Sequence, residues 1–131
     1  MYDHPNWGEH MGTSTKDFGD WGEQRAAAYL TAQGCKIIKR NFRLGQLGEI
    51  DLIAEDQGTL VFVEVKTQSS EAMGDAAAWV TPKKQRQIGK MAAAYLAFNQ
   101  IEDRDCRFDV VVVARSAQGV EIRHIPNAFW L

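Results

Sequence analysis

Apolar residues recur at helical spacing in the second half of the chain, after residue 81. They stand at positions i, i+3, i+4, i+7 and i+8, and they are Ile88, Met91, Ala92, Tyr95 and Leu96. This period predicts an amphipathic helix that buries one face. Thr81 can cap the helix through its hydroxyl, and Pro82 suits the first helical position because no N–H is needed there.

A narrower apolar stripe predicts a helix over residues 20–33. The stripe consists of Ala26, Ala27, Tyr29 and Leu30, and the side chains of the two alanines are small. Small side chains allow a helix to approach a sheet closely. Asp20 can cap this helix, Glu23 completes a capping-box pattern, and Gly34 can end it.

Five segments have the composition of strands, because they are short and alternate in polarity or are rich in β-branched residues. They cover residues 36–43, 49–54, 60–67, 107–114 and 120–125. Short glycine-containing turns join the first three, which predicts an antiparallel meander. The helix between the third and fourth favours a parallel pair. The sequence therefore predicts an α/β fold with a central mixed β-sheet flanked by helices, in the order α-β-β-β-α-β-β.

Length and composition indicate one globular domain. The chain has 131 residues, of which 45% are hydrophobic and 24% charged. These values exclude a disordered, collagen-like or coiled-coil protein. Residues 1–16 are polar and lack an apolar period, so we predict a flexible N-terminal tail there and a single domain over residues 17–131. Residues 68–80 are predicted to form a loop.

Charge and cysteine content bear on location and partners. The net charge is -2, which argues against a chain coated in phosphate-binding residues but allows a local basic face. No apolar run reaches the roughly 20 residues of a membrane span, and residues 1–20 lack the features of a signal peptide. Cys35 and Cys106 are isolated, which favours a reducing compartment. We expect a cytoplasmic protein with no membrane partner.

Two predicted strands carry carboxylates where a core pattern has none. Alternation places Glu49, Asp51 and Ile53 on one face, and it places Glu64 and Lys66 on the face of Phe62. The meander can bring Asp51 close to Glu64. Two neighbouring carboxylates repel each other unless a cation lies between them, and oxygen ligands suit Mg²⁺ or Mn²⁺. Periodicity alone favours a simpler alternative, an ion pair with Lys66 on an exposed sheet face.

Glu23 also has two interpretations. Spacing alone favours the capping box. Glu23 lies, however, on the helical face of Ala27 and Leu30, which we expect to pack on the sheet. A third carboxylate could therefore point toward Asp51 and Glu64.

These residues carry a resemblance. Asp51, a gap of twelve residues and Glu64-Val65-Lys66 resemble the signature of the PD-(D/E)XK nuclease superfamily. Over roughly residues 18–129 the chain resembles the YraN-like family of uncharacterised bacterial proteins, which is described as related to archaeal Holliday-junction resolvases. The matching stretches are 22–30, Arg40-Asn41-Phe42-Arg43, 48–54, 61–67, 81–84, 107–111 and Asn127-Ala128-Phe129. The resemblance implies a restriction-endonuclease-like fold.

The resemblance also implies roles for single residues. Asp51 and Glu64 would be metal ligands for Mg²⁺ or Mn²⁺, and Lys66 would orient the attacking water or stabilise developing charge. Glu23 matches an acidic residue that related resolvases place near the metal. The role of Glu49, typical of the family, is open. Family members usually have Arg where this chain has Gln68, which removes a phosphate contact but no metal ligand.

Two basic clusters bear on the substrate. One lies on the strand over residues 36–43 and includes Arg40 and Arg43; the other includes Lys83, Lys84, Arg86 and Lys90 at the start of the second helix. Neither window contains an acid, so contact with the phosphates of nucleic acid and an ordinary solvated surface are both consistent with the pattern. Trp79 and Trp130 are predicted to pack rather than to stack on bases.

The leading hypothesis is a metal-dependent endonuclease that hydrolyses phosphodiester bonds in DNA, with branched DNA as the substrate that the resolvase relatives suggest. An alternative is a non-catalytic nucleic-acid-binding or adaptor module that retains the nuclease fold. A third is an interaction protein whose charged strands form ion pairs. Related resolvases are symmetric dimers, so the resemblance implies a homodimer, although no interface is evident in the sequence.

Overall fold

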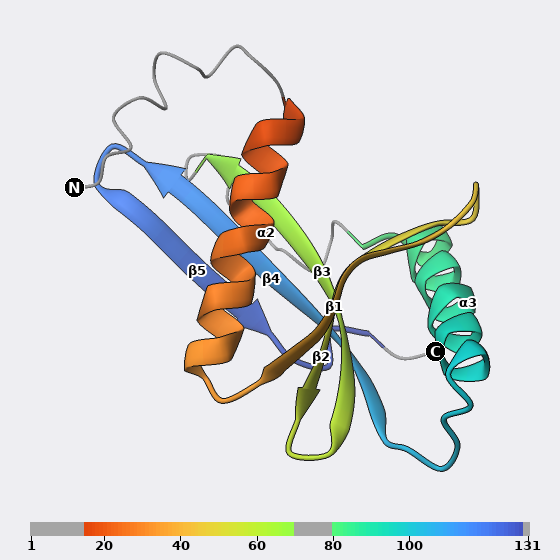
Figure 1. Cartoon of the computed structure of the whole chain (residues 1–131). Coiled ribbons are helices and arrows are strands. Elements are labelled where there is room, and N and C mark those ends of the chain that lie inside the picture. Colours follow the sequence, from red (N-terminus) through yellow and green to blue (C-terminus); the bar gives the residue numbers. More distant parts are fainter. Residues whose placement is uncertain (1–14, 70–79, 130–131) are drawn as a thin grey trace.

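The strand segments form one sheet whose spatial order follows the sequence, as seen in the computed structural model (Figure 1), which describes residues 15–69 and 80–129. Its elements are α2 (Thr15–Ala32), β1 (Lys36–Leu44), β2 (Gly48–Asp56), β3 (Thr59–Ser69), α3 (Pro82–Phe98), β4 (Cys106–Ser116) and β5 (Gly119–Ile125). β3 and β4 are parallel, and the other neighbouring pairs are antiparallel. The predicted mixed sheet and element order are confirmed.

The two helices cover opposite faces of the sheet (Figure 1). In β4, Val110 and Val112 pack in a core cluster with α3, whereas Val111 and Val113 pack in a second cluster with α2. All four valines are buried, as expected for an interior strand covered on both sides. Burial on both faces therefore explains why residues 107–114 are nearly all apolar.

The helix α3 follows the sequence prediction closely. The hydroxyl of Thr81 accepts a hydrogen bond of 3.2 Å from the backbone N–H of Lys84, and Pro82 is the first helical residue. Ile88, Met91 and Tyr95 are buried against the sheet. Local capping and apolar period agree here, so the sequence was sufficient.

The helix α2 begins earlier than predicted. It starts at Thr15, five residues before Asp20, so the prediction that Asp20 and Glu23 form a capping box is wrong. Asp20 lies inside the helix, and its carboxylate forms an ion pair of 2.8 Å with Lys16 one turn earlier. This pair supports an added N-terminal turn. Glu23 is consequently not needed to cap the helix and faces the sheet.

Close contact between α2 and β3 depends on a glycine. Gly22 is buried, and a Cβ atom added there would lie 1.9 Å from Oγ1 of Thr67 on β3. Only a residue without a side chain allows the helix backbone to approach the strand so closely. Because Glu23 follows Gly22 directly, this approach brings its carboxylate to the sheet.

Strand β2 does not alternate along its whole length. Ile53 packs with Ile50 in the α3 cluster, whereas Glu49 and Asp51 gather with Glu23 of α2. The prediction that Ile53 shares a face with Glu49 and Asp51 is therefore wrong. The physical cause is the register: β2 pairs with β3 only from Leu52 onward, and before Leu52 it pairs only with β1.

Several sequence predictions lie outside the described residues. These are the tail up to residue 14, the part of the predicted loop over residues 70–79, and both Trp79 and Trp130. Gln68 and Ser69, predicted in that loop, extend β3. Within residues 15–69 and 80–129, none of the helices has the length and apolar character needed to cross a membrane.

Candidate metal centre

Three carboxylates converge where α2 crosses β2. Glu23, Glu49 and Asp51 each offer an oxygen atom, and these atoms lie within 4.8 Å of one another. All three side chains are partly buried. We call these three residues the acidic centre. Glu23 and Asp51 were candidate site residues in the sequence, and the structure brings them together with Glu49.

The Asp51 carboxylate is fixed by the backbone of β3. Its Oδ2 atom accepts a hydrogen bond of 2.8 Å from the backbone N–H of Val65. The register between β2 and β3 ends at Leu52 and Val63, so the Asp51 side chain satisfies an N–H group beyond that end. A partly buried N–H without a partner would be costly, so the hydrogen-bond acceptor on Asp51 serves the backbone of β3.

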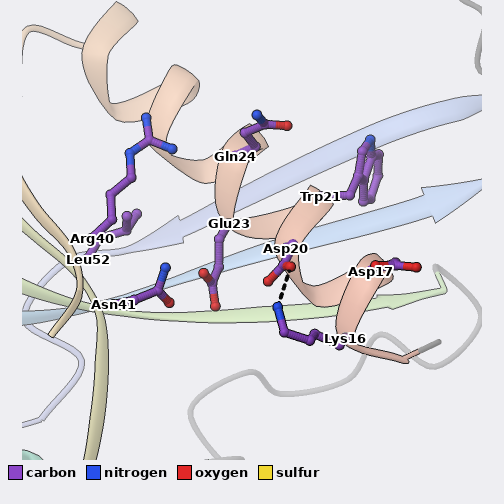
Figure 2. A pocket seen from close by; sticks show the side chains of 9 residues that line it. All are labelled: Lys16, Asp17, Asp20, Trp21, Glu23, Gln24, Arg40, Asn41 and Leu52. Atoms are coloured by element: carbon purple, nitrogen blue, oxygen red, sulfur yellow. Dashed lines mark hydrogen bonds and ion pairs between the residues drawn. The ribbon is translucent and has the colours of Figure 1, made fainter. Parts of the chain in front are cut away.

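Asn41 connects two members of the acidic centre. With its amide oriented to satisfy both groups, its nitrogen donates to Glu23 Oε1 at 3.0 Å and to Glu49 Oε2 at 2.5 Å. Figure 2 shows the Asn41 and Glu23 side chains pointing toward each other from β1 and α2. Asn41 has a φ of 54°, a conformation that Asn tolerates better than most residues. Sequence reasoning missed this role; an Asn within a strand pattern was the available signal.

Arg43 provides a second contact from β1. Its Nη2 atom lies 3.2 Å from Oε1 of Glu49. Glu49 is thus held by Asn41 and Arg43 on one side and faces Glu23 and Asp51 on the other. Glu49, whose role the sequence left open, therefore lies within the acidic centre.

Glu64 lies beside the acidic centre but outside its 4.8 Å limit. Its Oε2 atom forms an ion pair of 2.5 Å with Nζ of Lys84 on α3, a residue that the sequence placed among the nucleic-acid contacts. Among neighbouring charges, Glu64 has the largest effect on Asp51. The sequence-predicted pair Asp51 and Glu64 is therefore electrostatically coupled, while Lys66 is exposed and its charge also acts on Glu64.

Burial and mutual repulsion raise the pKa values of these carboxyl groups. Burial, followed by the charge of Glu64, raises the pKa of Asp51 to about 8. Burial and then the charge of Glu49 raise the pKa of Glu23. Burial raises the pKa of Glu64 as well, although Lys84 opposes this effect. Carboxylates with raised pKa values that face one another are typical of functional sites.

The acidic centre holds a proton near neutral pH. Because the pKa of Asp51 is about 8, its protonated form predominates at pH 7. A hydrogen bond between Asp51 and Glu23 lowers the pKa of Glu23 in partial compensation. A proton shared between carboxylates can be replaced by a metal cation, which needs the deprotonated ligands.

The carboxylates fit a small divalent cation. Ligand oxygens of an octahedral Mg²⁺ lie about 3 Å apart when adjacent and about 4.2 Å when opposite, for bonds of about 2.1 Å. The oxygens of Glu23, Glu49 and Asp51 lie within 4.8 Å of one another, so modest side-chain movement would suffice. Carboxylate oxygens also match the preference of Mg²⁺ and Mn²⁺.

A pocket of about 500 Å³ borders the acidic centre at Glu23. Glu23 and Gln24 of α2 line it together with Arg40 and Asn41 of β1 (Figure 2). Arg40, a predicted nucleic-acid contact, therefore lines the same pocket as Glu23. Among the other predicted contacts, Arg43 is exposed and pairs with Glu49, and Lys83, Arg86 and Lys90 are exposed on α3.

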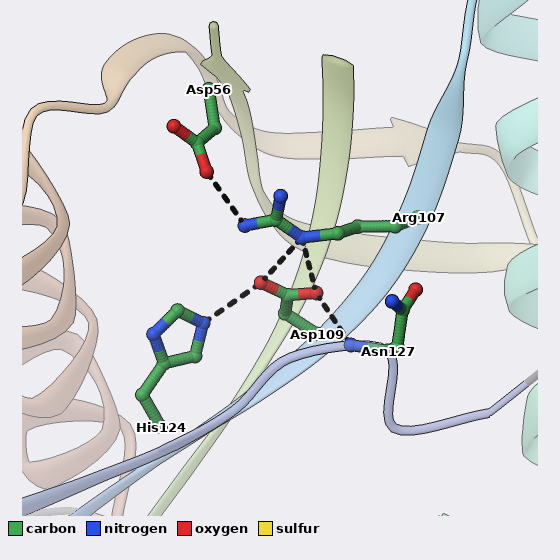
Figure 3. Close-up of polar contacts among 5 residues, drawn as sticks. All are labelled: Asp56, Arg107, Asp109, His124 and Asn127. Atoms are coloured by element: carbon green, nitrogen blue, oxygen red, sulfur yellow. Dashed lines mark hydrogen bonds and ion pairs between the residues drawn. The ribbon is translucent and has the colours of Figure 1, made fainter.

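A second charged network has a structural character. Asp109 is fully buried and accepts hydrogen bonds from Arg107 Nε at 3.0 Å and from the backbone N–H of Asn127 at 3.1 Å, with Nε2 of His124 at 2.8 Å (Figure 3). Arg107 also contacts Asp56 at 3.1 Å. With its oxygens satisfied in this way, Asp109 ties β4 to β5 and to the turn after it.

Sequence comparison identifies close relatives. A family model described as "Uncharacterised protein family UPF0102" matches residues 22–113, in agreement with the resemblance to YraN-like proteins. A UPF0102 protein of Geotalea uraniireducens is 48% identical over 117 residues, covering 88% of this chain and 91% of the relative. UPF0102 protein STH1475 of Symbiobacterium thermophilum is 50% identical over 112 residues, covering 85% and 94%.

A solved structure shows a distant similarity. Pyrococcus furiosus SfsA in complex with Ca²⁺ is 15% identical in sequence and matches with a TM-score of 0.33, covering 86% of this chain and 64% of that one. A similarity this low supports no argument about function. The names of the UPF0102 relatives state no activity either, so the acidic centre itself must carry the functional argument.

Proposed function

The chain belongs to the uncharacterised protein family UPF0102, and from the acidic centre we propose that it is a metal-dependent endonuclease that hydrolyses phosphodiester bonds in DNA. The observation that carries the proposal is the convergence of Glu23, Glu49 and Asp51 within 4.8 Å. Carboxylates at this separation, one of them with a pKa of about 8, are stabilised best by a cation between them.

The proposed ligands of Mg²⁺ or Mn²⁺ are Asp51, Glu23 and Glu49, with Glu64 as a fourth carboxylate that can exchange Lys84 for the metal. A bound divalent metal would lower the pKa of a coordinated water and act as a Lewis acid on the phosphate. The sequence signature supports this assignment, because Asp51, Glu64 and Lys66 match the PD-(D/E)XK pattern. The observed order of helices and strands also agrees with the restriction-endonuclease-like fold that the pattern implies.

Lysine side chains would stabilise the negative charge that develops during cleavage. Lys66 lies on β3 two residues after Glu64 and acts electrostatically on it. We assign Lys66 the stabilisation of negative charge on the phosphoryl group. Lys84 holds Glu64 through their ion pair, and burial alone would lower the pKa of Lys84, but the Glu64 hydrogen bond and charge raise it overall. Lys84 is therefore fully charged at neutral pH.

A polyanionic substrate is supported by the surroundings of the acidic centre. Lys16 and Arg40 line the same pocket as Glu23, together with Asp17 and Asp20, and Lys83, Arg86 and Lys90 are exposed on α3. These cations would contact phosphates rather than bases. Branched DNA, a homodimeric enzyme and a cytoplasmic location belong to the same proposal and are suggested by the resolvase resemblance and the isolated cysteines.

The deciding experiment combines metal binding with cleavage. Calorimetric titration with Mg²⁺ and Mn²⁺ should detect binding to the wild-type protein. The same protein should cleave one or more members of a panel of single-stranded, duplex, flap and four-way DNA. Asp51→Asn and Glu64→Gln should abolish cleavage, and Asp51→Asn and Glu23→Gln should reduce metal affinity at least tenfold.

The matched control is Glu121→Gln, which removes an exposed carboxylate of β5 far from the acidic centre in strand order. Its metal affinity and cleavage should equal those of the wild type. Unchanged metal affinity in both Asp51→Asn and Glu23→Gln would exclude the proposed centre.

A non-catalytic nucleic-acid-binding module is the second candidate. It is favoured by one observation, that Lys84 and Asn41 already satisfy the carboxylates of Glu64, Glu23 and Glu49 with protein groups. This candidate predicts salt-sensitive DNA binding without cleavage. The binding would survive Asp51→Asn and would be lost in Arg86→Gln.

A further inference from the structure

A groove of about 620 Å³ lies between β1 and the C-terminal end of α3. We propose that it binds an unpaired segment of a nucleic-acid strand, with a base stacked on Phe98 and the backbone along Lys39 and Arg43. This inference rests on the proposed function, because it specifies that the nucleic acid reaching the acidic centre would be unpaired. The groove shares Asn41 with the pocket in Figure 2 and otherwise has a different lining.

The groove contains exposed apolar side chains. Phe98 is 67% exposed and Ile38 is 40% exposed, and both line the groove. The rings of Phe42 and Tyr95, which also line the groove, pack edge-on with centroids 5.3 Å apart. An exposed aromatic ring such as that of Phe98 is a platform on which any base can stack, since every base has a π-face.

The charges around the groove suit a polyanion. Strand β1 carries Lys36, Lys39, Arg40 and Arg43 and no acid. Helix α3 carries four bases and no acid, although the whole chain has a net charge of -2. The bases of α3 all lie within residues 83–90, away from the groove at the other end of this helix. The positive charge at the groove therefore comes from β1, and the groove lining includes Lys39 and Arg43 without a carboxylate. Such a distribution attracts a phosphate backbone.

The groove is physically connected to the acidic centre. Asn41 lines both the groove and the pocket beside Glu23. Asn41 donates to Glu49 in the satisfied amide orientation, and Arg43, another groove residue, lies 3.2 Å from Glu49. Because α2 and α3 cover opposite faces of the sheet, a strand that leaves the groove would pass over the edge strand β1 at Asn41 to reach the carboxylates. This continuity favours a nucleic acid over an unrelated ligand.

An unpaired segment fits better than a duplex or a second protein copy. The stacking face of a base is hidden in a duplex and is accessible only where bases are unstacked. β1 is an edge strand with β2 as its partner in the sheet, so pairing with another copy is geometrically conceivable. The positive charges of two β1 strands would oppose that pairing, because each strand carries four basic residues.

The test measures binding in the absence of metal, so that cleavage does not interfere. Fluorescence anisotropy with a labelled oligothymidylate in EDTA should show binding by the wild-type chain. Phe98→Ala should weaken it about 5- to 100-fold, the loss expected for one stacked base. Lys39→Gln should reduce the slope of log affinity against log salt by about 0.7. Affinity for a blunt duplex should change less than twofold in Phe98→Ala.

The matched control is Val120→Ala, which truncates an exposed apolar residue on the opposite edge strand, β5, and should leave the affinity for oligothymidylate unchanged. Absence of wild-type binding, or equal affinity in Phe98→Ala, would overturn the groove proposal even if metal-dependent cleavage is found. A dimer that dissociates in Phe98→Ala, with unchanged DNA affinity, would also overturn it and assign the groove to a second copy. Phe98-dependent binding without any cleavage by the wild type would instead reject the nuclease and leave the groove intact.

Discussion

The carboxylate of Asp51 accepts a hydrogen bond of 2.8 Å from the backbone N–H of Val65. This contact joins β2 to β3 just beyond the point where their backbone register ends. Val65 lies between Glu64 and Lys66 in the chain, so the contact also fixes Asp51 relative to both. Asp51 and the segment Glu64-Val65-Lys66 are thereby held together by a main-chain group.

Asp51→Asn should stabilise the metal-free protein at pH 8. The Asn side chain can still accept the hydrogen bond from the Val65 N–H. The substitution removes the negative charge of Asp51, which burial and the nearby charge of Glu64 make unfavourable. We expect the free energy of unfolding in EDTA to rise by about 1–3 kcal/mol. Urea denaturation at pH 8 checks this, and a loss of stability would contradict the described electrostatics.

The pH dependence of the metal-free protein follows from the same residue. The pKa of Asp51 is about 8 in the folded chain, whereas the ordinary value of 3.8 applies to the unfolded chain. Between these two pH values the folded state therefore binds one more proton than the unfolded state. The contribution of Asp51 to the free energy of unfolding should therefore fall as pH rises from about 4 to about 8. Denaturation series across this range should show a smaller decline in Asp51→Asn than in the wild type.

Metal affinity should have the opposite pH trend. A metal ligand must be deprotonated, and the pKa of Asp51 is about 8, so Mg²⁺ binding should strengthen as pH rises from 6 toward 8 and release protons. Calorimetry in buffers with different ionisation enthalpies measures that release. A pH-independent affinity would show that Asp51 is not a ligand.

Gly22→Ala should disturb the acidic centre through the backbone. The added methyl group would meet Oγ1 of Thr67 at 1.9 Å, so either Thr67 or α2 must move. Overpacking of this kind costs about 1–3 kcal/mol, and displacement of Glu23 should weaken metal binding. Gly19→Ala is the control, since nothing lies within 4 Å of a Cβ added there. Addition of Thr67→Ala to Gly22→Ala should recover part of the lost stability.

Asn41→Gly should separate the backbone role of Asn41 from its amide. Gly accepts the φ of 54°, so the strand should remain intact, but Glu23 and Glu49 lose their shared donor. We expect Mg²⁺ to raise the melting temperature more in Asn41→Gly than in the wild type, because the metal then relieves a larger repulsion. Asn41→Ala should also lose about 1 kcal/mol from backbone strain. A smaller metal-induced shift in Asn41→Gly would contradict the arrangement.

Asp109→Ala should destabilise the fold without a specific effect on metal binding. Removal of the fully buried carboxylate takes away the acceptor that Arg107, His124 and the N–H of Asn127 share, and Arg107 keeps its contact with Asp56. Breaking a buried pair in this way costs about 3–5 kcal/mol. Burial opposes ionisation, but His124, Arg107 and Asn127 together lower the pKa of Asp109. The contribution of the ionised Asp109 carboxylate to the free energy of unfolding is therefore complete above about pH 4 and is lost as pH falls below that value. Acid denaturation curves would show this.

Elements with local signals were predictable from the sequence. The cap at Thr81, the apolar period of α3 and the alternation of β3 all depend on neighbouring residues in the chain, and each agrees with the structure. The paired valines of β4 indicated burial on both faces. Asp51 and Glu64 were recognisable as candidates because charge interrupts an apolar pattern.

The composition of the acidic centre required the tertiary structure. Whether Glu23 caps a helix or faces the sheet depends on where α2 begins and on the close approach at Gly22. The break in alternation at Asp51 arises from the end of the β2–β3 register. Asn41 and Lys84 reach the carboxylates from β1 and α3, and no local pattern predicts such contacts. The sequence by itself determined which residues could carry charge into the sheet, because side-chain polarity and spacing are local properties. Only the fold decided which of these charges meet, since long-range packing sets the distances between atoms far apart in the chain.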